Sequence, residues 1–356
     1  GIKNPLIVTD KGSTELYFIK ELKELLFKAN IKSDLFFDIS PNPREDEVSV
    51  GCKKYKDGSH DAIIAIGGGS AMDGGKLICL TANNDIPLRD FEFELTPPKI
   101  SKDNPFPKII TIPTTAGTGA ETEITAMVTY LKEGMKFCMW HPDARPVLAL
   151  VDPELTLGLP PSLTAWTGVD AMVHAIEGYC VPGFNPLCDG SAIESLSLIS
   201  KSLYLAVEEP KNLVARGGMH VGSYLGGVAF LKGLGLVHAI SHMVGAEFNT
   251  QHGLTNAIIL PVVLRYNLSG MDEKVKRMSE AMQFEDHSIE AFITNIEKML
   301  DRLNIPKSLS EIGVPEDCVE RIAKKAMKDQ AYATNPKIAT LEEVKEMTLA
   351  SIKKAR

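Results

Sequence analysis

The chain has 356 residues, with 46 Asp and Glu against 38 Lys and Arg, and it carries a formal net charge of −8 at pH 7. This length predicts two domains, and the acidic balance without a dense basic stripe argues against nucleic acid as a partner. No long uncharged apolar run is present and the six cysteines form no Cys-x-x-Cys pair, so we expect a cytoplasmic protein without membrane association or a disulfide framework.

Up to about residue 150, short β-branched runs alternate with helical patterns, which predicts an α/β domain with a mostly parallel sheet and helices on both faces. Such sheets bind ligands beyond the carboxyl ends of their strands. The predicted helices cover 13–29 and 71–83, and the predicted strands are 5–10, 33–38, 61–69, 108–115, 126–131 and 146–152. Because a strand begins at once and no initiator Met precedes it, we also expect a segment upstream of Gly1.

Beyond residue 152 nearly every segment has a helical pattern. Two prolines precede Ser162, the predicted N-cap of the first helix, and Thr340 with Glu343 forms a capping box that opens the last one. We therefore divide the chain into an α/β domain and an all-helical domain, at residues 1–155 and 156–356.

Two glycine-containing segments follow predicted strands. IAIGGGSAMDGGK, residues 64–76, leads into a helix, and PTTAGTGAETE, residues 113–123, adds threonine hydroxyls. Glycines let the backbone approach a phosphate, and the N–H groups at a helix N-terminus stabilise an anion. Either segment alone is compatible with a plain turn or surface loop, because the spacing is not G-x-G-x-x-G. Two such loops after neighbouring strands favour a nucleotide site.

An unusual concentration of imidazoles lies in the apolar stretch GLGLVHAISHMVGAEFNTQHG, residues 233–253. It holds three of the eight histidines: His238, His242 and His252. Upstream, Asp170 and His174 are four positions apart on a predicted helix and therefore share a face. A single histidine on an apolar helix face is usually a hydrogen-bonded core residue, but burying this many polar groups without a shared partner is costly. A divalent metal is such a partner: imidazole and carboxylate suit Zn(II) or Fe(II), and the absence of thiolates argues against a purely structural zinc site.

Several of these motifs together resemble the iron-dependent (group III) alcohol dehydrogenases. They are GGGSAMD, PTTAGTGAE, VDPELT, GVDAMVHAIE, and GLGLVHAISH followed by NTQHG. The similarity runs from LIVTD near the start to KDQAYATNPKIATLEEVKE near the end and so covers essentially the whole chain. The resemblance implies a dehydroquinate synthase-like architecture, in which the α/β domain binds NAD and the helical domain binds the metal.

The resemblance also assigns residues to the site. The implied metal ligands are Asp170, His174, His238 and His252. His242 falls outside this set, where it is implied to contact the nicotinamide or to relay a proton as a general acid/base. Gln251 precedes His252 at a position where proline is common in the family, a departure expected to loosen that loop.

For the cofactor, the resemblance implies Asp10, Asn42, Gly69, Ser70, Thr114, Thr115, Lys136, Leu155 and Gly158, and the two glycine-containing segments add Gly68, Asp73 and Thr118. Asp10 ends the first predicted strand, where similar proteins place an acidic residue against the adenosine ribose. A carboxylate there accepts hydrogen bonds from free hydroxyls and repels a 2′-phosphate, which favours NAD(H) over NADP(H).

The implied activity is hydride transfer between a small alcohol or diol and NAD(H), with aldehyde reduction as the reverse reaction. A metal, Fe(II) with Zn(II) as the alternative, binds the substrate oxygen as a Lewis acid, and the reaction takes place in the cleft between the two domains. We expect no macromolecular partner other than a second copy of the chain in a homodimer.

Three alternatives remain open at this point. A zinc-dependent glycerol dehydrogenase-like polyol oxidoreductase shares the architecture; dehydroquinate synthase does too, but no Lys and Arg cluster near the metal helices matches its anionic substrate. A metal-dependent hydrolase, with the glycine turn on a substrate phosphate, differs in not binding NADH. A binding protein that has lost turnover is disfavoured by the intact ligand set.

Overall fold

The computed structural model describes residues 1–356, and the chain divides into two compact units. One unit contains Gly1–Thr115 and Ala120–Leu155, and the other contains Ala116–Gly119 and Thr156–Arg356. The second half of the threonine-rich loop therefore packs with the helical part of the chain.

The first unit is an α/β unit built on a five-stranded parallel sheet in the order β2-β1-β3-β4-β7. Its elements are β1 (Pro5–Val8), α1 (Tyr17–Lys28), β2 (Asp34–Phe36), α2 (Glu45–Asp57), β3 (Ala62–Gly67), α3 (Gly69–Ala82), β4 (Lys108–Pro113), β5 (Thr125–Tyr130), β6 (Met135–Trp140) and β7 (Leu148–Ala149). In register, Val8 lies opposite Ala65, and Gly67 lies opposite Pro113. The carboxyl ends of β1, β3 and β4 thus meet at one edge of the sheet.

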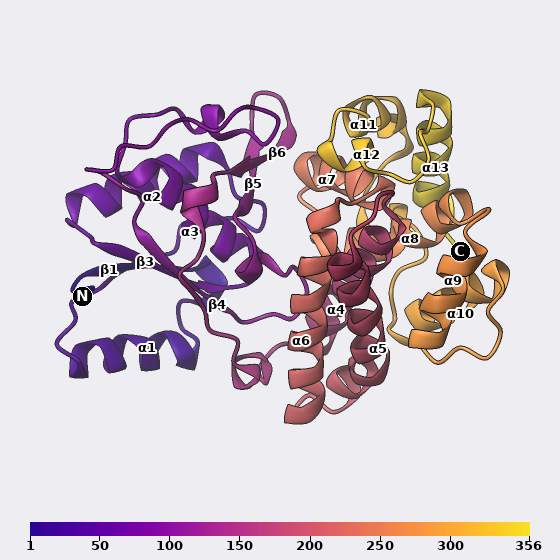
Figure 1. The fold of residues 1–356 in the computed structure, drawn as a ribbon, viewed down its shortest axis with the longest axis horizontal. Coiled ribbons are helices and arrows are strands. Elements are labelled where there is room, and N and C mark those ends of the chain that lie inside the picture. Colours follow the sequence, from indigo (N-terminus) through magenta and orange to yellow (C-terminus); the bar gives the residue numbers. More distant parts are fainter. The chain divides into compact units, whose positions relative to one another are not determined.

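Both faces of this sheet are covered, since the central strands β1 and β3 are apolar and buried at every position rather than at alternate ones. Ile64 and Ile66 of β3 pack with Phe18 and Ile19 of α1, while Ile63 and its neighbours pack in a second core with α2 and α3. Figure 1 shows α1 on one side of the strands and α2 and α3 on the other.

Two parts of the α/β unit differ from the sequence prediction. The strand expected at 126–131 is not part of the parallel sheet: β5 pairs with β6 in a separate antiparallel hairpin. The helix α2 was not predicted, because its charged sequence EDEVSVGCKKYKD hides a short apolar face that includes Val48 and Tyr55. Acidic residues in its first turn and lysines in its last turn complement the helix dipole.

The second unit is all-helical, as predicted. Its helices are α4 (Pro161–Cys180), α5 (Pro186–Glu208), α6 (Leu213–Ala229), α7 (Leu236–Phe248), α8 (His252–Asn267), α9 (Asp272–Ala281), α10 (Ile289–Arg302), α11 (Val319–Ala326), α12 (Gln330–Ala333) and α13 (Leu341–Lys353). Helix α4 packs against α5, α6 and α8 and is almost entirely buried beyond its first turn, which makes it the centre of this unit.

Helix termini show which capping signals were predicted correctly. The prediction of Ser162 as an N-cap was wrong: α4 begins at Pro161, whose fixed φ and missing N–H suit the first helical position. The capping box of Thr340 and Glu343 is confirmed at the start of α13. No single helix is both long and apolar enough to cross a bilayer; Leu213–Lys232 and Leu236–Phe248 pass that test only as a pair bent by 104°.

Candidate metal centre and cofactor residues

The four predicted metal ligands come from three helices of the helical unit. Asp170 and His174 lie one turn apart on α4, His238 is in the first turn of α7, and His252 is the first residue of α8. Gly253 allows α8 to approach α4 closely. A Cβ added there would collide with the carbonyl oxygen of Trp166 and lie 3.1 Å from Asp170 Cβ. The glycine therefore brings His252 to Asp170.

The candidate ligand atoms of these residues all lie within 4.8 Å of one another. Asp170 Oδ1 is 3.9 Å from the Nε2 atoms of both His174 and His238, and 3.7 Å from Nε2 of His252. Three of the four side chains are buried, whereas the His252 side chain is 24% exposed and is the ligand that solvent reaches. The structure thus brings together the four residues that the motifs predicted.

The protonation of His174 suits metal binding. Burial, only partly offset by the nearby Asp170 charge, lowers the pKa of His174 to about 4, so the ring is neutral at pH 7. Its Nδ1 lies 3.2 Å from the Gly117 carbonyl oxygen, an acceptor that holds the proton on this nitrogen. The Nε2 lone pair therefore faces Asp170.

A buried carboxylate that the sequence reasoning missed supports His238. Glu177 Oε2 lies 2.6 Å from His238 Nδ1, and Glu177 Oε1 accepts the backbone N–H of Val237 at 2.8 Å. Burial lowers the pKa of His238, but the hydrogen bond and charge of Glu177, together with Asp170, raise it more. Such a carboxylate fixes the ring orientation and makes Nε2 a stronger ligand. The available signal was an acidic residue three positions after His174, inside the GVDAMVHAIE motif.

The surroundings of these four side chains fit a divalent transition metal. One amide nitrogen, Asn256 Nδ2, reaches Asp170 Oδ1 at 2.7 Å, His238 Nε2 at 3.1 Å and His252 Nε2 at 3.2 Å. Three of the candidate ligand atoms therefore lie around one buried amide, and Asn256 Oδ1 is buried without a hydrogen-bond partner. Three imidazole nitrogens and one carboxylate oxygen are ligands that Fe(II) and Zn(II) both accept.

His242 lies beside the ligand cluster, with its ring stacked on that of His252 at a centroid distance of 5.4 Å. It is buried, and its Nδ1 is 2.9 Å from Asp329 Oδ2, a residue 87 positions away. The second oxygen of Asp329 accepts the backbone N–H of Ala331 at 2.8 Å. Asp329 therefore holds the imidazole in one orientation. The other ring nitrogen, Nε2, is not part of this contact.

Several predicted cofactor residues gather at the carboxyl edge of the sheet in the α/β unit. Asp10 follows β1 and accepts hydrogen bonds from the backbone and hydroxyl of Ser13, at 3.1 and 2.8 Å. Gly67 has a φ of +149°, and a Cβ there would lie 2.7 Å from Ala71 Cβ and 3.3 Å from Asp10 Oδ2. Only glycine fits this turn, which passes directly beside the Asp10 carboxylate.

The same edge carries buried hydroxyls that make no hydrogen bond. They are Thr9 Oγ1 and Thr115 Oγ1. A Cβ on Gly68 would lie 3.7 Å from Thr115 Oγ1, and α3 begins at Gly69. Unsatisfied hydroxyls next to a helix N-terminus and a glycine turn fit a polyanionic ligand such as a dinucleotide.

The remaining predicted cofactor residues have varied surroundings. Asn42 and Thr114 are buried, and Ser70 Oγ donates to the Pro41 carbonyl. Asp73 is engaged within the protein, because it accepts the Met127 N–H at 3.2 Å and lies 3.7 Å from Lys76 Nζ. Of the others, Lys136 and Leu155 belong to the α/β unit, and Thr118 and Gly158 belong to the helical unit.

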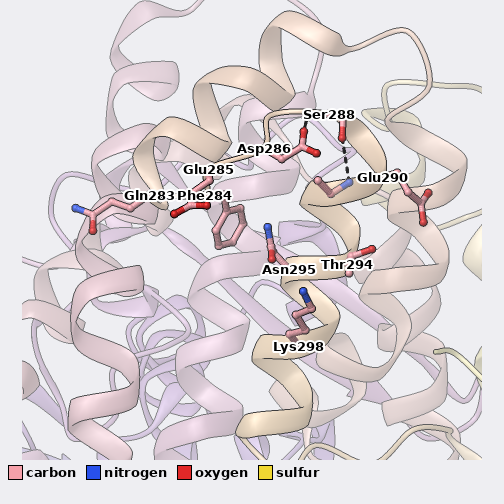
Figure 2. A pocket seen from close by; sticks show the side chains of 10 residues that line it. Gln283, Phe284, Glu285, Asp286, Ser288, Glu290, Thr294, Asn295 and Lys298 are labelled. Atoms are coloured by element: carbon pink, nitrogen blue, oxygen red, sulfur yellow. Dashed lines mark hydrogen bonds between the residues drawn. The ribbon is translucent and has the colours of Figure 1, made fainter.

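A cavity of about 600 Å³ lies elsewhere in the helical unit, around the loop before α10. Figure 2 shows its lining of charged, polar and apolar side chains, including Phe284, Asp286 and Lys298. None of the predicted ligand or cofactor residues contributes to it.

Comparison with known proteins identifies the family of the chain. Residues 1–153 match the family model for iron-containing alcohol dehydrogenase, and residues 164–352 match the C-terminal model of the same family. The chain belongs to the iron-containing alcohol dehydrogenase family. This membership confirms the predicted family and identifies the chain as an alcohol dehydrogenase of the metal-dependent type.

Members of the iron-containing alcohol dehydrogenase family align with almost the whole chain. The NAD-dependent methanol dehydrogenase of Bacillus methanolicus is 34% identical over 98% of this chain and 92% of its own length. The lactaldehyde reductase of Escherichia coli K12 is 35% identical over 98% of this chain and 91% of its own length. A crystal structure of a 1,3-propanediol oxidoreductase is 32% identical and superposes with a TM-score of 0.93, covering 99% of this chain and 93% of that one. The predicted dehydroquinate synthase-like fold is thus confirmed.

Proposed function

We propose that the protein transfers a hydride between a small alcohol or diol and NAD(H), with Fe(II) held by Asp170, His174, His238 and His252. The observation that carries this proposal is the convergence of one carboxylate and three imidazoles from three helices. The ligand set suits both iron and zinc, and membership of the iron-containing family favours iron.

The residues of the metal centre prepare it for substrate. A divalent cation there would act as a Lewis acid that lowers the pKa of a substrate hydroxyl, and nicotinamide would accept the hydride. His174 is neutral at pH 7 because burial lowers its pKa to about 4, and its Nδ1 proton points to Gly117. Glu177 holds the Nδ1 proton of His238, so both rings present Nε2 to the cation.

We assign proton transfer to His242. Its contact with Asp329 keeps a proton on Nδ1 and leaves Nε2 to accept the proton released by the alcohol. The stacking of His242 on His252 supports this role, because it places the ring beside a proposed ligand.

For the cofactor, we propose NAD(H) rather than NADP(H). The Asp10 carboxylate lies beside Gly67 at the carboxyl edge of the sheet, where it would bind the adenosine ribose hydroxyls and repel a 2′-phosphate. The turn from Gly68 to Ser70, followed by α3, would bind the pyrophosphate. The NAD dependence of the methanol dehydrogenase relative supports the same choice.

For the substrate, we propose a short alcohol, diol or the corresponding aldehyde. The named relatives act on methanol, lactaldehyde and 1,3-propanediol, which are alcohols or aldehydes of one to three carbon atoms. The homodimer and the cytoplasmic location also stay predictions. Analytical ultracentrifugation tests the homodimer. The six free cysteines are compatible with the cytoplasm, which is a reducing compartment.

The decisive experiment combines elemental analysis of anaerobically purified protein with NADH oxidation by a panel of short aldehydes and dihydroxyacetone. We expect stoichiometric iron, turnover of a short aldehyde, and NADH preferred over NADPH. His252→Ala should remove both metal and turnover, whereas His287→Ala, which changes a histidine bonded only to Phe284, should keep both. Metal retained by His252→Ala contradicts the ligand set. Zinc with dihydroxyacetone turnover favours a polyol oxidoreductase, and no binding of NADH favours a hydrolase.

A further inference from the structure

The loop of residues 37–44, between β2 and α2, packs against the first half of α3. Ile39 is buried, and a Cβ on Gly74 of α3 would lie 2.8 Å from the Ile39 Cδ1 atom. One turn earlier on the same face of α3, the Ser70 hydroxyl donates to the Pro41 carbonyl. Since Ser70 belongs to the turn proposed to bind the pyrophosphate, this loop lies directly beside that turn.

A single carboxylate closes the loop of residues 37–44. Glu47 Oε2 accepts the backbone N–H of Ser40 at 3.2 Å and that of Arg44 at 3.1 Å, and Glu47 Oε1 accepts the Ser40 hydroxyl. Only 10% of the Glu47 side chain is exposed, and hydrogen bonds to a charged acceptor are stronger where water is excluded. Asn42, one of the predicted cofactor residues, lies midway between the two residues that Glu47 joins.

The two neighbours of Asn42 are also held. The Pro41 carbonyl accepts the Ser70 hydroxyl, and the Pro43 carbonyl accepts the Thr129 N–H at 2.7 Å. Both neighbours are prolines, whose rings fix φ. Asn42 itself is buried. The loop therefore presents Asn42 beside the glycine turn on a backbone with little freedom of its own.

We propose that Glu47 is a positioning residue for the cofactor, because it holds this loop in the conformation in which Asn42 contacts NAD(H). A loop that adopts its binding conformation for only a fraction of the time binds its ligand more weakly by that fraction. The proposed metal ligands belong to the helical unit, so Glu47 should set the affinity for the cofactor and not the metal content. This inference rests on the proposed NAD(H) site, with Asn42 as one of its contacts, but not on the substrate.

The test measures NADH binding to the full-length protein by fluorescence titration, and the kinetics of aldehyde reduction. Glu47→Ala removes every bond by which the carboxylate closes the loop, so we expect the Kd and the KM for NADH to rise about tenfold. The kcat, the KM for the aldehyde and the bound metal should stay at their wild-type values. A higher KM with unchanged kcat indicates lost cofactor binding, whereas partial unfolding would lower kcat and bound metal together.

A second variant separates hydrogen bonding from charge. The amide oxygen of Glu47→Gln can accept both backbone N–H groups that now bond Oε2, and its nitrogen can donate to the Ser40 hydroxyl. We expect its NADH affinity to return to within about threefold of the wild type. The matched control is Asp46→Ala, which removes the same charge from the same turn of α2, from a side chain that bonds the Arg44 guanidinium instead of the loop backbone. It should leave NADH affinity unchanged.

The outcomes separate this inference from the proposed function. Unchanged NADH affinity in Glu47→Ala overturns the role of Glu47 and leaves the proposed cofactor standing, and so does an equal loss in Asp46→Ala. A wild-type protein that does not bind NADH removes the proposed cofactor and the inference with it. Rising affinity in the order Glu47→Ala, Glu47→Gln, wild type supports the inference.

A third variant decides if Glu47→Ala does not fold. Ser40→Ala removes one hydroxyl from the Glu47 carboxylate and keeps both backbone bonds. We expect the Kd for NADH to rise about threefold, with kcat and bound metal unchanged. An NADH affinity equal to that of the wild type in both Ser40→Ala and Glu47→Gln would then contradict the role of Glu47.

Discussion

At the scale of single residues, the proposed metal centre depends on side chains that hydrogen-bond to the ligand side chains or to the backbone of the helices that carry them. Glu177 bonds His238 and the backbone at Val237, and Gln251 accepts the N–H of Leu254 at 2.6 Å, which caps α8. The expectation that Gln251 loosens this loop stays a prediction, and this hydrogen bond acts against it. A side chain that caps the helix keeps its first residue, His252, in place.

Glu177→Gln provides one test of these supporting contacts. The amide keeps the shape but loses the charge that orients His238 and strengthens Nε2 as a ligand. We expect metal affinity to fall by about 10- to 100-fold, measured by chelator competition on the metal-free protein. Glu290→Gln, at an exposed site on α10, is the control. Unchanged affinity in Glu177→Gln would show that the carboxylate has no influence on the ligand.

Asp329→Asn tests the orientation of His242. Asparagine can still cap α12 through its side-chain oxygen, but it no longer presents a charged acceptor to Nδ1. We expect kcat to fall on the order of 10²-fold, because proton transfer loses its oriented base, while bound metal is retained. Steady-state kinetics and elemental analysis measure the two quantities, and loss of metal would assign Asp329 a structural role instead.

The clustering of the four proposed ligands was predictable from sequence, whereas their supporting residues were not. Asp170 with His174, and His238 with His242, have helical spacing that places each pair on one face. The contacts of Glu177 with His238 and of Asp329 with His242 join positions 61 and 87 residues apart. No local pattern encodes such a contact, because it depends on how helices pack.

At the scale of elements, glycine controls the approach of helices that carry ligands. Helix α8 touches α4 at Gly253, and Gly226 of α6 lies against the Ala171 carbonyl of α4, where a Cβ would be 3.1 Å from that oxygen. The close packing of α4 with its neighbours therefore depends on residues without side chains. Helix α4 carries two of the proposed ligands, Asp170 and His174, and is still almost entirely buried beyond its first turn.

Gly253→Ala should separate α8 from α4. The added methyl collides with the Trp166 carbonyl, which cannot move without distorting α4. Overpacking of this kind costs about 1 to 3 kcal/mol, and we expect the shift of His252 to weaken metal binding as well. Thermal unfolding and chelator competition check both effects. Gly190→Ala, at an α5 position with open space, should leave metal binding unchanged and raise the stability by about 0.5 to 1 kcal/mol, because alanine favours the helix.

The strands differ in how much of their arrangement the sequence predicts. The strands β1, β3 and β4 are continuous apolar runs and were found, because burial on both faces leaves a strong signal. The segment of β5 was also predicted as a strand, but it pairs antiparallel with β6 instead of joining the parallel sheet. The residue pattern of a segment predicts that it forms a strand. It does not predict which other strand it pairs with.

At the scale of the whole molecule, each unit has its own interior. The α/β unit buries two apolar cores on the faces of its sheet, and the metal ligands all belong to the helical unit. The predicted domain ranges, 1–155 and 156–356, stay a prediction about which parts fold together, because only unfolding experiments measure cooperativity.

Metal removal provides that measurement. A ligand that binds only the folded state stabilises it, by about 4 kcal/mol at a free concentration a thousand times its Kd. Calorimetry with and without a chelator should therefore show one transition, that of the helical unit, moving to lower temperature while the transition of the α/β unit stays in place. A single transition that moves as a whole would show that the two units unfold together.

The spacing of the ligands along the chain has a consequence for biosynthesis. Of the proposed ligands, Asp170 and His174 of α4 leave the ribosome first, His238 follows three helices later on α7, and His252 completes the set at the start of α8. A growing polypeptide that ends before α8 lacks one of the four proposed ligands, and a site that loses a ligand binds a cation more weakly. We therefore expect products truncated ahead of α8 to retain less of the proposed metal than the full-length chain.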